Sequence, residues 1–150
     1  MQNTMTFQSV IAAVQAFSEA FKIPFSMSPT TALSSEGVAL RHRLMEEENN
    51  EYLEAAEAGD LVEVADALGD QLYILCGTIL SHGMQDVIED VFREIQASNM
   101  SKLGENGLPI LREDGKVMKG PHYFRPDISR ILADSAAALS QESQQLDTEL

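Results

Sequence analysis

The stretch "RLMEEENNEYLEAAEAGDLVEVADALGDQLYILCGTIL", residues 43–80, decides the fold of this chain. Apolar residues recur at helical spacing on both sides of "AGD", residues 58–60. That tripeptide forms a tight turn in which Asp60 is the N-cap of a new helix. The stretch therefore predicts two long helices, at about 36–58 and 61–82, that fold back on each other.

Two further helices flank this pair. Apolar residues at helical spacing predict one over about 6–22, and Gly83 separates the helix at 61–82 from another at about 85–102. Short connections between long amphipathic helices favour an all-α fold, and an antiparallel four-helix bundle is the simplest arrangement.

The C-terminal part of the chain has a different composition. Residues 104–126 are rich in Gly and Pro and predict a short irregular or hairpin segment around "LPIL" and "KVMKG". The tail, 129–150, has a weak helical pattern and is expected to be helical or partly disordered. We expect one domain over 1–128, with its helical core at 36–102, followed by this tail.

Composition excludes several classes of partner. The chain has 150 residues and a net charge of −14, from 24 acidic and 10 basic residues, so it should repel nucleic acid and anionic membranes. Its single cysteine, Cys76, lies in an apolar run and suits a reducing cytoplasm. We find neither a signal-peptide pattern nor an apolar run long enough to span a membrane, and expect a cytoplasmic protein.

The helix at 61–82 is apolar on nearly every side, which is typical of a central, well-buried helix. Asp66 and Asp70 interrupt one side, and buried carboxylates are costly unless a partner compensates them. The opposite side carries an apolar stripe of Leu61, Ala65, Leu68, Leu72, Leu75 and Ile79. Four helices from one chain are not expected to cover all of this surface, which indicates assembly with further copies of the chain.

The turn also predicts which residues of the two helices face each other. Residues equidistant from it are opposite, so Glu48 faces Gln71, and Asp66 and Asp70 come level with Glu48 and Glu51. Four carboxylates at one level suit a hard divalent cation, Mg²⁺ or Mn²⁺, which prefers oxygen ligands. A merely solvated acidic helix face is the alternative interpretation of the acidic run.

Three segments carry a resemblance to a known superfamily. "RLMEEENNEYLEA", "GDLVEVADALGDQLYILCGT" and "EIQASNMSKLGENGLPILREDGKVMKGPHYFRPDI" resemble the MazG-like all-α nucleoside triphosphate pyrophosphohydrolases, and most closely their phosphoribosyl-ATP pyrophosphohydrolase-like branch, over about 36–128. The resemblance implies Mg²⁺-dependent hydrolysis of a nucleotide to the monophosphate and pyrophosphate, as in nucleotide-pool house-cleaning. It also implies homodimers or homotetramers and allows Mn²⁺ to substitute for Mg²⁺.

The superfamily signature is an E-E-x-x-E helix followed by an E-x-x-D helix, which together hold Mg²⁺. Glu47, Glu48 and Glu51 match the first part residue by residue. The resemblance implies that Glu48 and Glu51 are metal ligands. It also implies that Glu47 is the general base, which takes a proton from the attacking water.

The second part of the signature is incomplete in this chain. Asp70 matches its final aspartate, but the position three residues earlier is Ala67 instead of glutamate. We expect Asp66, one position away, to act as the fourth metal ligand. Glu63, which forms a literal E-x-x-D with Asp66, is the alternative ligand.

Groups that contact the substrate are expected outside the two acidic helices. Lysine can contact a phosphate, and an amide can bind a base edge or ribose. The candidates for substrate binding are Asn99, Lys102, Lys119 and Tyr123. Ordinary surface and packing roles are the alternatives for them, and Phe17, Phe21 and Phe25 are interpreted as core.

Other kinds of helical protein fit less well. A di-iron bundle needs Glu-x-x-His, and none of His42, His82 and His122 has glutamate at that spacing. The alternative that Ala67 favours is non-catalytic: a helical dimerisation or nucleotide-binding module with a degraded metal site.

Overall fold

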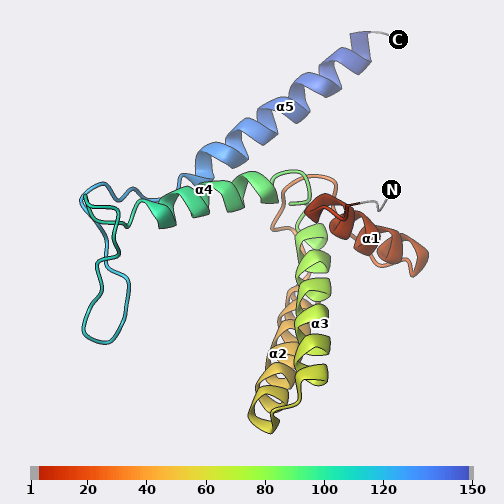
Figure 1. Ribbon diagram of the computed structural model, residues 1–150. Helices are drawn as coiled ribbons and strands as arrows, with labels where there is room; N and C mark the ends of the chain where they lie inside the picture. Colours follow the sequence, from red (N-terminus) through yellow and green to blue (C-terminus); the bar gives the residue numbers. More distant parts are fainter. Residues whose placement is uncertain (1–3, 149–150) are drawn as a thin grey trace. The chain divides into compact units, whose positions relative to one another are not determined.

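The computed structural model describes residues 4–148, apart from the side chains of 142 and 145–148. Within that range the secondary structure is helical, with one isolated β-bridge (Figure 1). The helices are α1 (Phe7–Ala20), α2 (Ser35–Ala58), α3 (Leu61–Ser81), α4 (Ile88–Met100) and α5 (Ile128–Thr148). The predicted all-α class is confirmed.

Contacts within the chain define two compact units, which divide between Gln85 and Asp86. The first contains α1, α2 and α3, and the second contains α4, α5 and the segment between them. Helix α5 shows that the tail is helical as far as Thr148, whereas 149–150 lie outside the described residues. The packing of α4 as the fourth helix of a bundle, and the domain bounds 1–128 and 129–150, stay predictions.

The turn between α2 and α3 has the predicted form. Gly59 ends α2 in the left-handed conformation, at φ 71°, which glycine adopts without strain. The Asp60 carboxylate accepts hydrogen bonds from the backbone N–H groups of Val62 and Glu63, at 3.0 and 3.2 Å. Two of the N–H groups that a helix start leaves unpaired are thereby satisfied, and α3 begins at Leu61.

Helices α2 and α3 run side by side (Figure 1). Two side chains, those of Gln71 and Arg41, hold them in register. Gln71 Nε2 donates to the backbone oxygen of Glu48 at 3.2 Å, which confirms the predicted pairing of these residues. Further along, Arg41 Nε donates to Thr78 Oγ1 at 3.0 Å and Arg41 Nη2 to the carbonyl of Ile74 at 2.7 Å. The hydrogen bonds of Gln71 and Arg41 join residues that are equally far, or nearly so, from the turn in the sequence. The turn therefore sets the register of the whole helix pair.

The segment between α1 and α2 crosses the C-terminal end of α3. Ser26 N–H donates to Leu80 O at 3.0 Å, and Thr30 N–H donates to His82 O at 2.9 Å. Gly83 lies beneath this crossing at φ 65°, and a β-carbon there would be 2.0 Å from the carbonyl oxygen of Ser28. Only glycine fits, so the sequence at 83 fixes where the segment passes.

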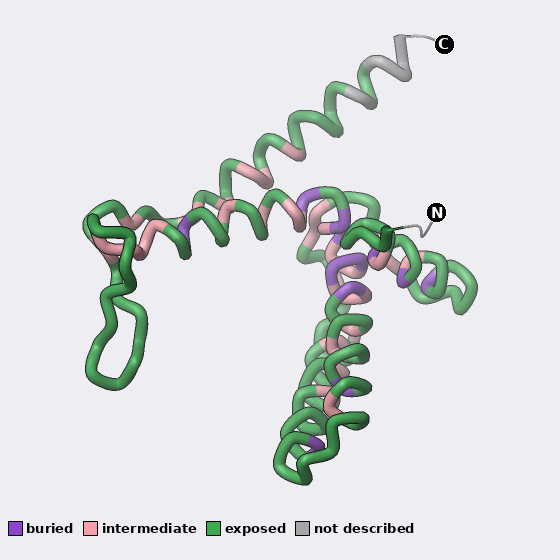
Figure 2. The backbone as a smooth tube through the Cα atoms, viewed as in Figure 1, coloured by how far each residue is buried: buried purple, intermediate pink, exposed green. Residues whose placement is uncertain are grey.

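The buried residues of the first unit form a small core (Figure 2). Its largest members are Ile11, Val14, Cys76, Ile79 and Leu80, contributed by α1 and α3. Between α2 and α3 the buried residues are small, Ala55 and Ala67. Helix α3 is therefore covered on one side only by the helices of its own unit.

The prediction that α3 is buried on nearly every side is wrong for the single chain. In the predicted apolar stripe only Ile79 is buried, and Leu68, Leu72 and Leu75 are 50%, 41% and 46% exposed. The reason is that α1 and α2 contact the other side of α3. Periodicity indicates that a surface is apolar, but it does not say which element covers it.

The second unit contains the predicted hairpin. Leu111 and Val117 form an antiparallel bridge, and Met118 N–H donates to Ile110 O at 2.7 Å across it. Ser98 at the end of α4 donates through Oγ to the carbonyl of Phe124 at 2.8 Å, which fixes the return of the chain before α5. Across the described part of the chain, no helix combines the length and the apolar character that crossing a membrane requires.

Gly83 and Gly69 provide a matched test of this packing. Gly83→Ala should lower the free energy of unfolding by about 2 kcal/mol or more, because the new methyl group meets the Ser28 backbone and φ is positive. Gly69→Ala adds a methyl group that meets nothing within 4 Å on a helix, and should be neutral or raise stability by up to about 1 kcal/mol. Urea unfolding measures both, and equal effects would contradict the described crossing.

Candidate active site

The predicted metal ligands come together on the α2–α3 pair. Glu48 on α2 is half-buried, and its Oε2 atom is buried without a hydrogen bond from any residue that the structure describes. The other four acids are exposed: Glu47, Glu51, Asp66 and Asp70. The expectation that Glu51 and the two aspartates face inward is therefore wrong for the single chain, in which only Glu48 does so.

Electrostatics shows that these acids surround Glu48. Burial raises the pKa of the Glu48 carboxyl, and the negative charges of Glu51, Asp70, Glu47 and Asp66 raise it further, in that order. Two of these charges come from α2 and two from α3, as the register predicts. Glu63 is not among the charges acting on Glu48, which favours Asp66 over Glu63 as the residue that compensates for Ala67.

Ala67 itself lies between the helices and is 2% exposed. A glutamate at this position would start from the interface between α2 and α3. Asp66 is the preceding residue and is exposed, so its carboxylate reaches the acidic cluster from outside the interface. Asp66 can therefore add a carboxylate to the cluster although alanine occupies the signature position.

The five acids fit a divalent cation of the Mg²⁺ type. No three His, Cys, Asp or Glu side chains in the described ranges already converge as a closed set of metal ligands. Mg²⁺ does not require such a set, because it keeps several waters and takes one or two carboxylates together with substrate phosphates. The unpartnered Glu48 oxygen and the surrounding negative charge are features that a cation would compensate. The ligand set stays a prediction.

A cavity of about 140 Å³ lies within the first unit, and two residues of its lining, Leu44 and Tyr73, are one helical turn from Glu48 and Asp70. It is lined by α1, by the segment after α1, and by α2 and α3, and its walls include Phe17, Phe25, Arg41 and Tyr73. Burial lowers the pKa of the half-buried Arg41. Gly77 makes room for it, since a β-carbon at 77 would be 2.8 Å from Arg41 Nη2.

The phenylalanines predicted as core are not buried: Phe17 and Phe25 line this cavity, and Phe21 is exposed. Phe17 is 39% exposed and Phe21 67% exposed, and their ring centroids are 4.3 Å apart. Phe17 also meets Tyr73 edge-to-face at 5.6 Å. Sequence reasoning did not identify Arg41 and Tyr73 as residues that line this cavity. Gly77 lies near the position opposite Arg41 on the paired helices, where the lack of a β-carbon allows close approach.

The substrate-binding residues predicted after residue 98 lie in the second unit as two pairs. Lys102 Nζ donates to Asn99 Oδ1 at 2.7 Å, and Lys119 Nζ lies 4.4 Å from the ring centroid of Tyr123. The segment that contains Lys119 and Tyr123 passes close to the end of α4 at Gly120. A β-carbon at position 120 would be 2.1 Å from the backbone oxygen of Leu103, so glycine is needed for this approach. The role of the four residues in substrate binding stays a prediction.

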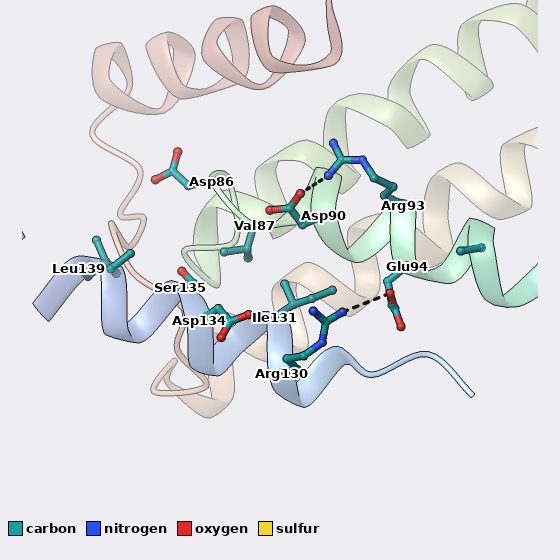
Figure 3. A pocket seen from close by; sticks show the side chains of 12 residues that line it. Asp86, Val87, Asp90, Arg93, Glu94, Arg130, Ile131, Asp134, Ser135 and Leu139 are labelled. Atoms are coloured by element: carbon teal, nitrogen blue, oxygen red, sulfur yellow. Dashed lines mark hydrogen bonds and ion pairs between the residues drawn. The ribbon is translucent and has the colours of Figure 1, made fainter. Parts of the chain in front are cut away.

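A larger cavity of about 790 Å³ lies between α4 and α5 (Figure 3). Arg130 pairs with Glu94 at 3.6 Å, and Arg93 pairs with Asp90. Asp86 and Asp134 add further negative charge to the lining. With both arginines paired and acids in excess, this cavity is poorly suited to a triphosphate.

The chain matches a known protein family. Its described part is all-helical, and its acids gather on the antiparallel pair of α2 and α3. The model of the phosphoribosyl-ATP pyrophosphohydrolase family matches residues 14–99, more than half of the chain. The chain belongs to this family. The matched range contains all five acids and Asn99, and it ends before Lys102, Lys119 and Tyr123.

The chain is similar to a crystal structure of a proposed NTP pyrophosphohydrolase from Exiguobacterium sp. 255-15, at 25% sequence identity and a TM-score of 0.47. The similarity covers 89% of this chain and 97% of that one. No curated protein matches the chain.

The raised pKa of Glu48 predicts a pH-dependent stability. The folded state holds this proton at a higher pH than the unfolded state, so the charged carboxylate destabilises the fold once pH exceeds its folded pKa. In chelator, Glu48→Gln should raise the melting temperature at pH 8 by about 2–4 °C, and the difference should vanish near pH 4. Glu46→Gln is the control, and a lower melting temperature for Glu48→Gln at pH 8 would contradict the prediction.

Proposed function

We propose that this protein hydrolyses a nucleoside triphosphate, or a related nucleotide, to the monophosphate and pyrophosphate in a Mg²⁺-dependent reaction, with Mn²⁺ able to substitute. The observation that carries the proposal is the buried, unpartnered Glu48 oxygen among four further carboxylates. Membership of the phosphoribosyl-ATP pyrophosphohydrolase family supports the reaction class. House-cleaning of the cytoplasmic nucleotide pool is the role proposed for it.

An acidic protein needs a cation between itself and a triphosphate. The net charge is −14, and the acids around Glu48 repel phosphate oxygens unless their charge is compensated. Bound Mg²⁺ would supply that compensation and stabilise the charge that develops on the phosphates during hydrolysis. Glu48 and Asp70 would hold it from facing helices, with Glu51 and Asp66 able to turn toward it from their exposed positions.

Glu47 is the proposed general base. It is adjacent to Glu48 and exposed, so it can contact a water molecule without leaving the acidic cluster. Hydrolysis adds the elements of water across the bond between the α- and β-phosphates. The hydroxyl group joins phosphorus, Glu47 accepts the proton, and the bridging oxygen leaves with one of the two products.

Kinetics with matched variants tests these roles. With Mg²⁺ and a panel of nucleoside triphosphates, the native chain should release pyrophosphate. Glu47→Gln should lower kcat about 10²- to 10⁴-fold, as expected for loss of a general base, with little change in KM. Glu48→Gln should lower activity at least as far and weaken Mg²⁺ binding, whereas Glu46→Gln should change neither.

The alternative is a module that binds nucleotides or dimerises without catalysis, and Ala67 at a signature position is the observation that favours it. The two functions differ in one measurement. Pyrophosphate release that depends on Mg²⁺ and on Glu48 supports the enzyme. Absence of release from every triphosphate, by a folded chain that binds nucleotides, would support the module.

The exposed stripe of α3 supports a homodimer or homotetramer. Leu68, Leu72 and Leu75 line a groove of about 620 Å³ with Met45 of α2. These leucines are 41–50% exposed in the single chain, and burying such a surface between copies would stabilise the assembly. We propose the side of α2 and α3 that contains this groove as the interface.

Sedimentation at micromolar concentration tests the assembly. The native chain should sediment as a dimer or tetramer, and Leu72→Glu should shift it to the monomer, because the new charge would be buried without a partner. Met27→Glu is the control, since Met27 is an exposed apolar residue of the α1–α2 segment. A native chain that is monomeric under these conditions would contradict the proposal.

A further inference from the structure

Gln71 joins α3 to the backbone of the proposed ligand Glu48. Its Nε2 atom donates to the carbonyl oxygen of Glu48 at 3.2 Å, and its side chain is half-buried. Gln71 is also the neighbour of Asp70 in the sequence, so one side chain connects the parts of α2 and α3 that carry these two acids. A change at Gln71 would therefore alter the position of the two acids relative to each other.

In the part of the chain that the structure describes, no other hydrogen bond joins the two helices at the level of these acids. Arg41 donates to α3 about two helical turns away from Glu48 along α2. The turn at Gly59 lies about three helical turns away in the other direction. Gln71 therefore holds the helix pair at its middle, where the acids are.

Apolar packing does not lock the helix pair at this level. The buried residues between α2 and α3 are small, Ala55 and Ala67. Alanine lets two backbones approach, but its methyl group does not interlock with a facing side chain as a larger residue does. A hydrogen bond is directional, and it fixes both the spacing of the helices and their rotation.

Charge works against the pairing at this level. Glu47, Glu48 and Glu51 lie on α2, whereas Asp66 and Asp70 lie on α3. The negative charges of both helices act on Glu48, so the helices repel each other there when no cation is bound. The Gln71 hydrogen bond opposes this repulsion. It ends on a backbone carbonyl, and it therefore uses none of the carboxylate oxygens that a cation needs.

The spacing of the two helices matters more for Mg²⁺ than for Ca²⁺. Mg²⁺ requires near-octahedral coordination at about 2.0–2.1 Å, whereas Ca²⁺ accepts about six to eight oxygens at about 2.3–2.6 Å in flexible arrangements. A looser helix pair would keep the negative charge that attracts both cations. It would lose the geometry that distinguishes them.

We propose that Gln71 is a positioning residue, which holds Glu48 level with Asp70 and thereby makes the cation site selective for Mg²⁺ over Ca²⁺. The inference rests on the proposed function, because it concerns the same cation site. Gln71 acts through the backbone of Glu48 and supplies no ligand of its own.

Competition for bound Mn²⁺ measures this selectivity without the reaction. The electron paramagnetic resonance signal of free Mn²⁺ is lost on binding, and added Mg²⁺ or Ca²⁺ restores it by displacement. Gln71→Met keeps the length of the side chain but donates no hydrogen bond, and it should weaken Mg²⁺ binding by about tenfold and Ca²⁺ binding by less than about threefold. The matched control is Gln15→Met, which removes the hydrogen bond from Gln15 to Glu19 on α1 and should change neither affinity.

A second variant separates this role from assembly, because Gln71 also lines the groove proposed as the interface between copies. Gln71→Asn keeps an amide in the groove, but its side chain is one methylene shorter and should not reach the Glu48 carbonyl. It should lower the preference for Mg²⁺ as Gln71→Met does, with the native assembly in sedimentation. An unchanged preference in both variants would overturn the inference. If a variant dissociates, the same loss of preference in a dissociated Leu72→Glu chain, which keeps Gln71, would overturn it too.

Pyrophosphate release gives a second readout. At limiting Mg²⁺ the Gln71→Met chain should release pyrophosphate more slowly than the native chain, and a higher Mg²⁺ concentration should restore the native rate, because the variant keeps every acid. A rate that stays low at saturating Mg²⁺ would contradict the proposed role. If no triphosphate is hydrolysed, the proposed function fails, whereas Mn²⁺ competition still decides the role of Gln71. A native chain that binds no Mn²⁺ would overturn both.

Discussion

The pairing of α2 with α3 is the interaction on which the site depends. A turn at Gly59 and Asp60 sets the register, and Gln71 and Arg41 hold it by donating hydrogen bonds across the pair. These bonds end on backbone carbonyls and one threonine, not on carboxylates. The acids of both helices therefore stay outside the cross-links, and the register that the turn imposes brings them to one level.

Crowding of negative charge constrains the chemistry of the site. A stable fold without a bound cation gains nothing from four acids around one half-buried glutamate, since each of them raises the pKa of the Glu48 carboxyl. Only Glu48 bears the cost of burial, whereas the remaining four stay hydrated and can turn. The arrangement combines one half-buried carboxylate with four exposed ones, which would suit the proposed cation, because Mg²⁺ retains water and also binds substrate phosphates.

The sequence predicts the parts of the structure that depend on local rules. Helix ends at Gly59 and Asp60 follow from capping, and the pairing of Glu48 with Gln71 follows from counting away from the turn. The exposure of Leu72 could not be predicted, because apolar periodicity does not distinguish contact within a chain from contact between chains. The cavity at Arg41 depends on where the segment after α1 crosses the helix pair, and such a tertiary contact leaves no periodic signal.

The α2–α3 pair thus presents three surfaces with different physical roles. Small residues, among them Ala55 and Ala67, bring the helices together, and the leucine stripe of α3 remains available to another copy of the chain. Leu44 and Tyr73, which line the cavity at Arg41, each lie one helical turn from an acid, Glu48 and Asp70 respectively.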